Sequence, residues 1–261
     1  MSIEMELETA TKEKRSSRFH PAPLSCLDPH RIPSHVALIP DGNRRWAKKQ
    51  LLSPHLGHQA GADRLIEVVR GAQELNIKAL TFFAFSTENW LRSKFEVAAL
   101  MSIYTTFLTV KREEMVEDDI KLETIGDLTP FPASLKKVIA DTKAATAHCE
   151  SIRLVLAFNY GARNEICRAF KSMLEDYDNN LLSKDDVTEK TIARYLDTAH
   201  LGDPELLIRT SGELRVSNYL LWQISYAEIV VTQVLWPDFT PHHLLDAILE
   251  YQKRQKRLGG D

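Results

Sequence analysis

The sequence predicts a single α/β domain with a central, mostly parallel sheet flanked by helices. From His35 onward, short apolar runs alternate with longer segments of helical periodicity, a pattern typical of βαβ units. No internal repeat or linker interrupts it, so one domain is the simpler interpretation of the 261 residues. The expected strands are Val36–Ile39, Ala79–Phe85, Leu122–Ile125, Arg153–Phe158, Leu206–Ile208 and Ile229–Val231.

The first 33 residues differ from the rest of the chain. They are polar and charged, contain Pro21, Pro23, Pro29 and Pro33, and show no sustained apolar period. We therefore expect residues 1–33 to form a flexible N-terminal arm and residues 34–261 to form the domain.

Two of the expected helices differ in character. Apolar residues recur at helical spacing from Ala62 to Ala72, which predicts an amphipathic helix. From Phe95 to Val110 they occupy nearly every face, which indicates either a buried core helix or the wall of an apolar ligand site. Sequence alone favours the core, and a hydrocarbon ligand would favour the wall.

The bulk composition excludes several classes of protein. A formal net charge of -3 provides no basic field for nucleic acid, so we expect no nucleic-acid partner. Cys26, Cys149 and Cys167 show no zinc-site spacing and favour a reduced, cytoplasmic protein. We expect neither a signal peptide nor a membrane span, because the N-terminus is acidic and no apolar stretch approaches about 20 residues.

Polar residues follow four of the expected strands. Because ligands of open α/β sheets bind outside the carboxyl ends of the strands, these residues should meet at one rim. Guanidinium groups pair bidentately with phosphate oxygens, so an arginine cluster there is a candidate anion site. Asp41, followed by Gly42, is placed to hold Mg²⁺ against a phosphate, although residues 41–43 also fit an ordinary capped turn. The candidate arginines are Arg45, Arg92, Arg209 and Arg215.

Other local signals are weaker. His58 fits a phosphate contact and a helix start equally well, and sequence alone favours the core for Trp46 and Trp90. The chain has no G-x-x-x-x-G-K-[ST] loop and no G-x-G-x-x-G string after a strand, which argues against an ordinary nucleoside triphosphatase or a dinucleotide enzyme. It also lacks the D-D-x-x-D helix motif of trans-type prenyltransferases.

Five strings, in order along the chain, resemble the motif set of cis-prenyltransferases, particularly bacterial undecaprenyl diphosphate synthase. They are HVALIPDGNRRWAKK from residue 35, FFAFSTENWLRS from 82, AFNYGAR from 157, IRTSGELRVSNYLLWQ from 208 and YAEIVVTQVLWPDF from 226. Five motifs in the family's order are far more specific than a single glycine-rich string.

This resemblance implies a magnesium-dependent homodimer with a hydrophobic tunnel. The expected reaction condenses isopentenyl diphosphate onto an allylic diphosphate, with farnesyl diphosphate as the expected primer. The expected product is a long polyprenyl diphosphate, undecaprenyl diphosphate, which feeds a cell-wall lipid carrier. The resemblance is also compatible with a peripheral contact with the inner face of the plasma membrane, through which product would be released. The alternative is a non-catalytic partner subunit of a heteromeric prenyltransferase, but such subunits lack the Asp41–Trp46 motif.

The resemblance also implies residue roles. Asp41 would bind Mg²⁺ and assist departure of the allylic diphosphate, and Glu228 would be a second metal-associated carboxylate. Asn89 matches the family's proposed proton acceptor, although a neutral amide is a weak base and also fits an orienting role. The residues expected around the allylic diphosphate are Gly42, Asn43, Arg44, Arg45, Trp46 and His58. The same substrate-binding loop would carry Ser86, Thr87, Glu88, Trp90 and Arg92, while isopentenyl diphosphate would contact Arg209, Arg215 and Ser217, with Val216 beside them.

The chain departs from the family's pattern at four positions that bear on binding. Pro54 stands where many members have an arginine, Ser211 replaces a glycine, Leu214 a histidine and Gln233 an aspartate. The missing arginine bears on affinity for the allylic diphosphate, and the missing histidine and aspartate bear on the metal shell. The string Arg257–Gly259 resembles a C-terminal tail that reaches the neighbouring subunit in this family.

Overall fold

The computed structural model of the protein describes residues 17–254, and these contain one six-stranded sheet in the order β3-β4-β2-β1-β5-β6. Every strand pair is parallel. All six expected strands are confirmed, with ends that differ by one or two residues. They are β1 His35–Ile39, β2 Ala79–Ser86, β3 Ile120–Ile125, β4 Ile152–Tyr160, β5 Leu206–Arg209 and β6 Glu228–Val231.

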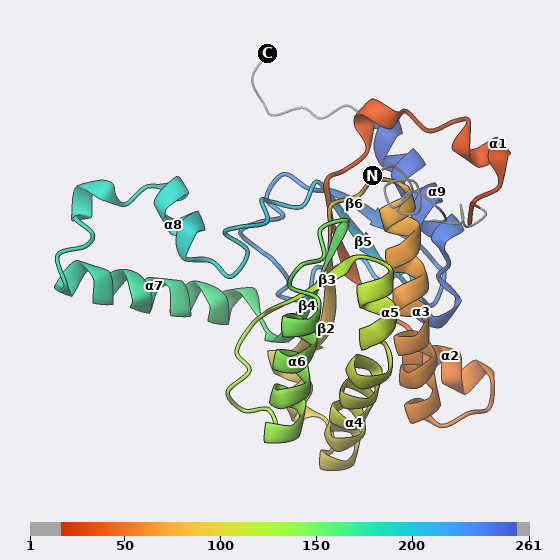
Figure 1. Ribbon diagram of the computed structural model, residues 1–261, viewed down its shortest axis with the longest axis horizontal. Coiled ribbons are helices and arrows are strands. Elements are labelled where there is room, and N and C mark those ends of the chain that lie inside the picture. The colour runs from red at the N-terminus through yellow and green to blue at the C-terminus, as the bar shows by residue number, and fades with distance from the viewer. Residues whose placement is uncertain (1–16, 255–261) are drawn as a thin grey trace, which may run out of the picture.

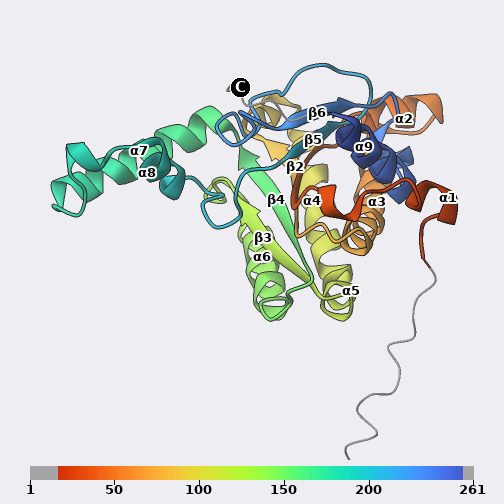
Figure 2. The ribbon, with the colours of Figure 1, turned by 90° about the horizontal axis from the view of Figure 1, so that it is seen from above.

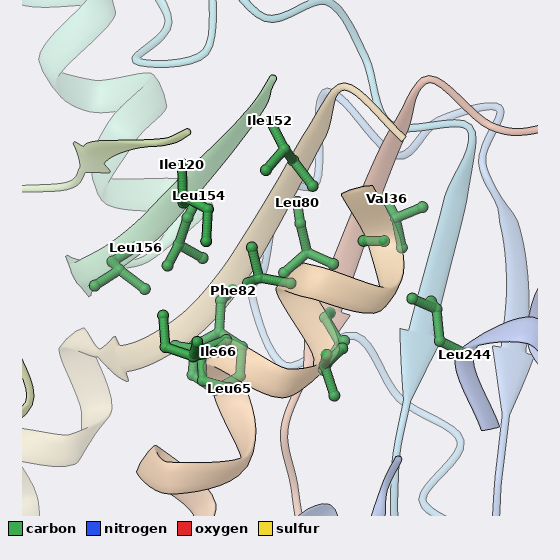
Figure 3. Close-up of a cluster of buried hydrophobic side chains, with 14 of the residues drawn as sticks. Val36, Leu65, Ile66, Leu80, Phe82, Ile120, Ile152, Leu154, Leu156 and Leu244 are labelled. Carbon is green, nitrogen blue, oxygen red and sulfur yellow. The ribbon is translucent and has the colours of Figure 1, made fainter. Parts of the chain in front are cut away.

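Helices cover one face of the sheet, where α3, α4, α5 and α6 lie together (Figures 1 and 2). In the larger core, Leu65 and Ile66 of α3 lie beside Phe82 of β2, as Figure 3 shows. The helices are α1 Pro21–Leu24, α2 Asn43–Lys49, α3 Pro54–Glu74, α4 Lys94–Val110, α5 Arg112–Glu117, α6 Ala133–Ala145, α7 Ala162–Asp178, α8 Glu189–Tyr195 and α9 Pro241–Lys253. Short 3₁₀ turns are η1 Pro29–Arg31, η2 Thr87–Leu91, η3 Lys184–Asp186 and η4 Trp236–Asp238.

The second face of the sheet carries a smaller core. Here Ala37 and Val155 of the sheet share a cluster with Tyr219 and Leu220, which come from the segment after β5. The ring of Tyr219 stacks on Phe83 of β2 with centroids 4.3 Å apart. A loop therefore covers part of this face, and helix α7 extends away from it as a separate arm (Figures 1 and 2).

Residues 17–33 pack against the body of the protein. The ring of Phe19 is 4% exposed and belongs to the larger core. The backbone N–H of Asp28 donates to Gln252 of α9 at 3.0 Å. This part of the expected arm is therefore held in place by apolar and polar contacts, while residues 1–16 and the Arg257–Gly259 string lie outside the described residues.

The sheet places its topological switch between β1 and β5. Strand β1 pairs with β2 on one side and with β5 on the other, and Ile39 lies beside Arg209 at their carboxyl ends. Such a point is where open α/β sheets form their ligand crevice. Asp41, two residues beyond β1, and Arg209, the last residue of β5, therefore lie where a ligand is expected to bind.

Candidate active site

A cavity of about 630 Å³ opens at this edge of the sheet and continues between the sheet, α3 and α4. Its polar lining is Asp41, Asn43, His58, Ser86, Glu88, Asn89, Arg92, Arg209, Arg215, Ser217 and Asn218. Its apolar lining includes Leu65, Phe82, Leu100, Ile103, Tyr104, Phe107 and Leu156. The predicted polar rim thus borders an apolar interior.

Asp41 lies among three guanidinium groups. Its carboxylate accepts a hydrogen bond from Arg209 Nη2 at 2.8 Å, and Arg45 and Arg215 lie 3.5 Å and 4.0 Å from its oxygens. Gly42 has a φ of 109°, a left-handed conformation that favours glycine and turns the chain sharply after Asp41. Burial opposes ionisation, but the hydrogen bond and charge of Arg209 and the charge of Arg45 hold the pKa of Asp41 below its ordinary value. Asp41 is therefore a carboxylate at neutral pH.

Arg209 is fixed in place from several sides. Its side chain is 5% exposed, and Nη1 donates to Ser217 Oγ at 2.9 Å and to the carbonyl of Arg215 at 2.5 Å. Its Nε is buried without a hydrogen-bond partner among the described residues. A buried donor of this kind usually has a partner, which a bound anion would supply.

Arg45 is held by the segment after β5. Its Nη1 donates to the carbonyl of Ser211 at 3.0 Å and lies 3.0 Å from Glu213 Oε1, while Nη2 donates to the Ser211 hydroxyl. Glu213 also pairs with Arg215 at 2.5 Å. These contacts orient Arg45 of α2 and Arg215 of the segment after β5 toward Asp41.

Comparisons with known proteins agree with this geometry. Residues 39–259 match the model of a family described as "Putative undecaprenyl diphosphate synthase". An isoprenyl transferase of Chlamydia muridarum is 49% identical over 87% of this chain and 92% of its own length. An isoprenyl transferase of Halalkalibacterium halodurans is 43% identical over 97% of this chain and 99% of its own.

A solved structure is also similar. Lavandulyl diphosphate synthase from Lavandula x intermedia, in complex with dimethylallyl diphosphate, has a TM-score of 0.86 and 36% identity, covering 88% of this chain and 100% of its own. The chain belongs to the undecaprenyl diphosphate synthase family. The resemblance noted in the five strings is confirmed, and the protein is a prenyltransferase with this family's α/β fold.

The prenyltransferase presents His58 to the cavity in its neutral form. His58 Nε2 lies 3.7 Å from Glu96 Oε1, which also accepts from Arg92 at 2.9 Å. Burial and the charges of Arg92 and Arg44 lower the pKa of His58 to about 4, and Glu96 only partly opposes this. The nearby arginines, rather than His58, therefore carry the positive charge at this wall.

Asn43 lies at the start of α2, where two glycines of α3 let it approach. A Cβ on Gly61 would lie 2.3 Å from Asn43 Oδ1, and one on Gly57 would lie 2.2 Å from the Asn43 carbonyl. Both positions leave no room for a side chain. The close packing of α2 on α3 sets Asn43 in the cavity wall, with Oδ1 buried and unpartnered among the described residues.

The loop after β2 brings Ser86, Glu88, Asn89 and Arg92 to the cavity. Asn89 Oδ1 accepts from the backbone N–H of Ser86 at 3.1 Å, which completes a capping box around η2. Glu88 accepts from Asn218 at 3.1 Å and so ties this loop to the segment after β5.

Several expected binding residues support the cavity from outside its lining. Trp46 donates to Asp238 at 2.7 Å and Trp90 to Asn159 at 2.8 Å, so both indoles are hydrogen-bonded to protein. The other residues in this group are Gly42, Arg44, Arg45, Thr87 and Val216.

Glu228 lies apart from Asp41. It is the first residue of β6, and the parallel register places it beside Leu206, the first residue of β5. Asp41 follows the carboxyl end of β1, which lies at the opposite edge of the sheet from these first residues. Glu228 is ion-paired with Arg254 at 3.0 Å. Within the described residues of one chain, the structure does not bring the two expected metal carboxylates together.

The cavity also contains residues that the sequence argument did not single out. Asn218 lines it, and Glu96 and Glu213 position its arginines. Arg92 lies just before α4 and Glu96 in its first turn, so their separation of four residues in the sequence was a visible signal for a pair. Asn218 had no comparable signal, because its contact with Glu88 joins segments 130 residues apart.

Proposed function

We propose that this prenyltransferase condenses isopentenyl diphosphate onto an allylic diphosphate, with farnesyl diphosphate as primer. The observation that carries the proposal is a cavity in which an arginine-rich mouth leads to an apolar interior. Such a cavity suits a substrate with an anionic head and a hydrocarbon tail. The long product would be undecaprenyl diphosphate, for use as a cell-wall lipid carrier.

The arginines at the mouth would bind the two diphosphates. Arg209 and Arg215, with Ser217, would hold isopentenyl diphosphate, and Arg45 and Arg92 would face the allylic diphosphate with Asn43 and His58. Guanidinium groups stabilise the negative charge that builds on a departing diphosphate, especially where water is excluded. The orphaned Nε of Arg209 supports an anion at the mouth.

Asp41 would hold Mg²⁺ together with diphosphate oxygens. The residues fit this ion because Asp41 is ionised and borders the cavity, and Mg²⁺ sites commonly use one or two carboxylates plus substrate phosphates. When bound, Mg²⁺ would neutralise charge on the leaving diphosphate. Glu228 keeps its proposed role as a second metal-associated carboxylate, but this role does not require it to share an ion with Asp41 of the same chain.

We assign Asn89 an orienting role near the lost proton. Its Oδ1 already accepts a hydrogen bond from Ser86, and an amide oxygen is a weak base. Orienting a diphosphate or a water molecule fits this geometry better than taking the proton directly.

The apolar part of the cavity would hold the growing chain. Leu100, Ile103, Tyr104 and Phe107 line it at i, i+3, i+4 and i+7 of α4. One face of this helix is therefore a wall, while Leu108 on another face is fully buried in the core. Each added isoprene unit gains roughly 25 cal/mol per Å² of apolar surface removed from water.

We also propose that the enzyme is a homodimer formed through α7. Helix α7 extends from the body of the protein as an arm (Figure 1). Its Phe170 is 60% exposed and its Leu174 46% exposed beside an apolar groove of about 330 Å³ shared with α8. A second copy would cover both arms, because a two-fold interface buries the same patch twice. Phe170→Glu should yield monomers in light scattering, and an unchanged dimer would place the interface elsewhere.

Radiolabelled isopentenyl diphosphate, farnesyl diphosphate and Mg²⁺ provide the direct test. Chain-length chromatography should show a ladder ending at a long cis product. A folded protein with no incorporation would favour the non-catalytic subunit, which the intact Asp41–Trp46 segment and the cavity argue against. We further propose a cytoplasmic location, consistent with the free thiols of Cys26, Cys149 and Cys167.

A further inference from the structure

Large apolar side chains are exposed around the mouth of the cavity. Leu51 in the turn between α2 and α3 is 94% exposed, and Leu52 and Leu56 beside it are 41% and 45% exposed. Leu91 and Phe95, before and within the first turn of α4, are 89% and 82% exposed. We call these five residues the apolar rim. Exposed apolar groups gathered in this way mark an interaction surface.

The two parts of the rim belong to one end of the molecule. The starts of α3 and α4 meet where His58 lies 3.7 Å from Glu96, and Figure 1 shows the α2–α3 connection and the first turn of α4 at the same end. Leu56 precedes the cavity-lining His58 by two residues, and Leu91 precedes Arg92 directly. A surface that covered the rim would therefore face the mouth.

The rim is accompanied by positive charge. Residues 43–62 include Arg44, Arg45, Lys48 and Lys49 and contain no Asp or Glu, in a chain whose net charge is -3. The side chains of Lys48 and Lys49 are exposed. An open hollow of about 480 Å³ is lined by Arg44, Arg45 and Lys48 on its cationic side and by Leu51, Leu52 and Pro54 on its apolar side.

We propose that the apolar rim and its lysines dock the enzyme on an anionic lipid surface. Leucine and phenylalanine side chains enter the boundary between headgroups and acyl chains, while lysines contact lipid phosphates. Charge complementarity selects anionic lipid as the occupant. Among the described residues no helix is long and apolar enough to cross a bilayer, so the attachment is peripheral.

Docking would also serve the reaction. This consequence rests on the proposed function, because only a long polyprenyl product has to pass from the cavity into a membrane. With the rim in the headgroup region, the cavity mouth faces lipid, and the product's tail leaves one apolar environment for another with little exposure to water.

The test is sedimentation of the full-length protein with vesicles, without substrate. Vesicles of phosphatidylcholine mixed with phosphatidylglycerol should bind the protein, and phosphatidylcholine alone should bind it weakly. Leu51→Ser and Lys48→Glu should each weaken binding to the anionic vesicles by roughly fivefold or more. Activity in detergent should stay unchanged for both variants, because neither residue lines the cavity.

Val110→Ser is the matched control. Val110 is 62% exposed at the opposite end of α4, about 24 Å from the first turn at 1.5 Å per residue. It should bind anionic vesicles like the unmodified protein. Equal weakening by Val110→Ser, or equal binding to neutral and anionic vesicles, would overturn the proposal.

The vesicle assay separates this inference from the proposed function. A protein that condenses isopentenyl diphosphate but stays in the supernatant with anionic vesicles contradicts docking alone. A protein that binds anionic vesicles through Leu51 and Lys48 but makes no polyprenyl product supports docking and contradicts the proposed reaction.

Discussion

Replacing Asp41 by asparagine separates its chemical role from its structural one. The change removes the negative charge that faces Arg209, Arg45 and Arg215 but keeps an oxygen that accepts the 2.8 Å hydrogen bond from Arg209. Asp41→Ala removes both. If Asp41 holds Mg²⁺ and helps the diphosphate leave, both variants should lose turnover by a factor on the order of 10³ or more.

The structure predicts a much smaller effect on stability. A hydrogen bond to a charged group contributes about 1.5–3 kcal/mol, and the 30% exposure of the Asp41 side chain favours the lower end of that range. Arg209 keeps its contacts with Ser217 and the carbonyl of Arg215 in both variants. We expect Asp41→Ala to lose about 1.5 kcal/mol of unfolding free energy and Asp41→Asn less.

The measurements are incorporation of labelled isopentenyl diphosphate across a Mg²⁺ titration and urea unfolding of each variant. Glu67→Gln is the control, since Glu67 forms an ion pair with Arg64 on the exposed side of α3, away from the cavity. It should keep full turnover. Near-normal turnover of Asp41→Asn with unchanged Mg²⁺ dependence would refute the assignment, and losses of turnover that follow stability would make Asp41 a structural residue.

Three further predictions concern the cavity wall. Ala84→Leu should shorten the products, because its added atoms enter the cavity beside Tyr104. The Tyr104 hydroxyl donates to the Ala84 carbonyl at 2.5 Å. Products of unchanged length from a folded variant would show that Ala84 is a core residue and does not limit chain length. His58 has an ordinary pKa of 6.5 and a folded pKa of about 4, so the stability it contributes is present above pH 6.5 and lost as pH falls toward 4. In urea unfolding, His58→Gln should reduce this loss of unfolding free energy by up to roughly 3 kcal/mol. An unchanged dependence of the unfolding free energy on pH would contradict the prediction. Ser211→Gly should raise the Tm, because glycine adopts a φ of 73° without strain. The same change should raise the KM of the allylic substrate severalfold, because Arg45 loses its hydrogen bond to the Ser211 hydroxyl. Ser211→Ala should raise the KM without the gain in Tm, and wild-type KM values in both would exclude positioning by the hydroxyl.

The fold was predictable because its signals are local. The six strands are short apolar runs, and the sheet buries β1 completely, so every residue from His35 to Ile39 is buried. The polar rim was predictable for a related reason. Parallel strands end at the same edge, so Asp41 and Arg209 had to lie close once their strands were known to be neighbours.

The role of α4 could not be decided from its sequence. A helix that is apolar on all sides is more often core, but it also fits a ligand wall, because periodicity does not reveal which face meets empty space. Here Leu100, Ile103 and Phe107 line the cavity, and Leu100 and Phe107 also belong to the larger core together with Leu108. The position of Glu228 relative to Asp41 was also not predicted from its motif. The motif identifies the residue, but the direction of β6 in the sheet determines where it lies.

Three of the four departures from the family's pattern gather on one wall of the site, and Pro54 lies apart from them at the start of α3. Ser211 and Gly212 donate backbone hydrogen bonds to Val234 and Thr232, and a Cβ on Gly212 would lie 2.4 Å from Gln233 Oε1. Gln233 therefore packs directly on the segment that holds Arg45, and it is neutral where the pattern has an aspartate.

Leu214 completes this wall, since it is 84% exposed where the pattern has a histidine. Glu213 beside it is an acidic neighbour of Asp41, but Arg45 and Arg215 lie 3.0 Å and 2.5 Å from its oxygens and compete for them. The wall thus offers guanidinium groups with few additional ligands for a cation. Mg²⁺ requires six oxygens in near-octahedral geometry and retains water readily. If Asp41 holds Mg²⁺ as proposed, most of the ligands of the ion would therefore come from diphosphate and water. On this proposal, the arginines that would attract the diphosphate would also determine whether Asp41 can hold the metal.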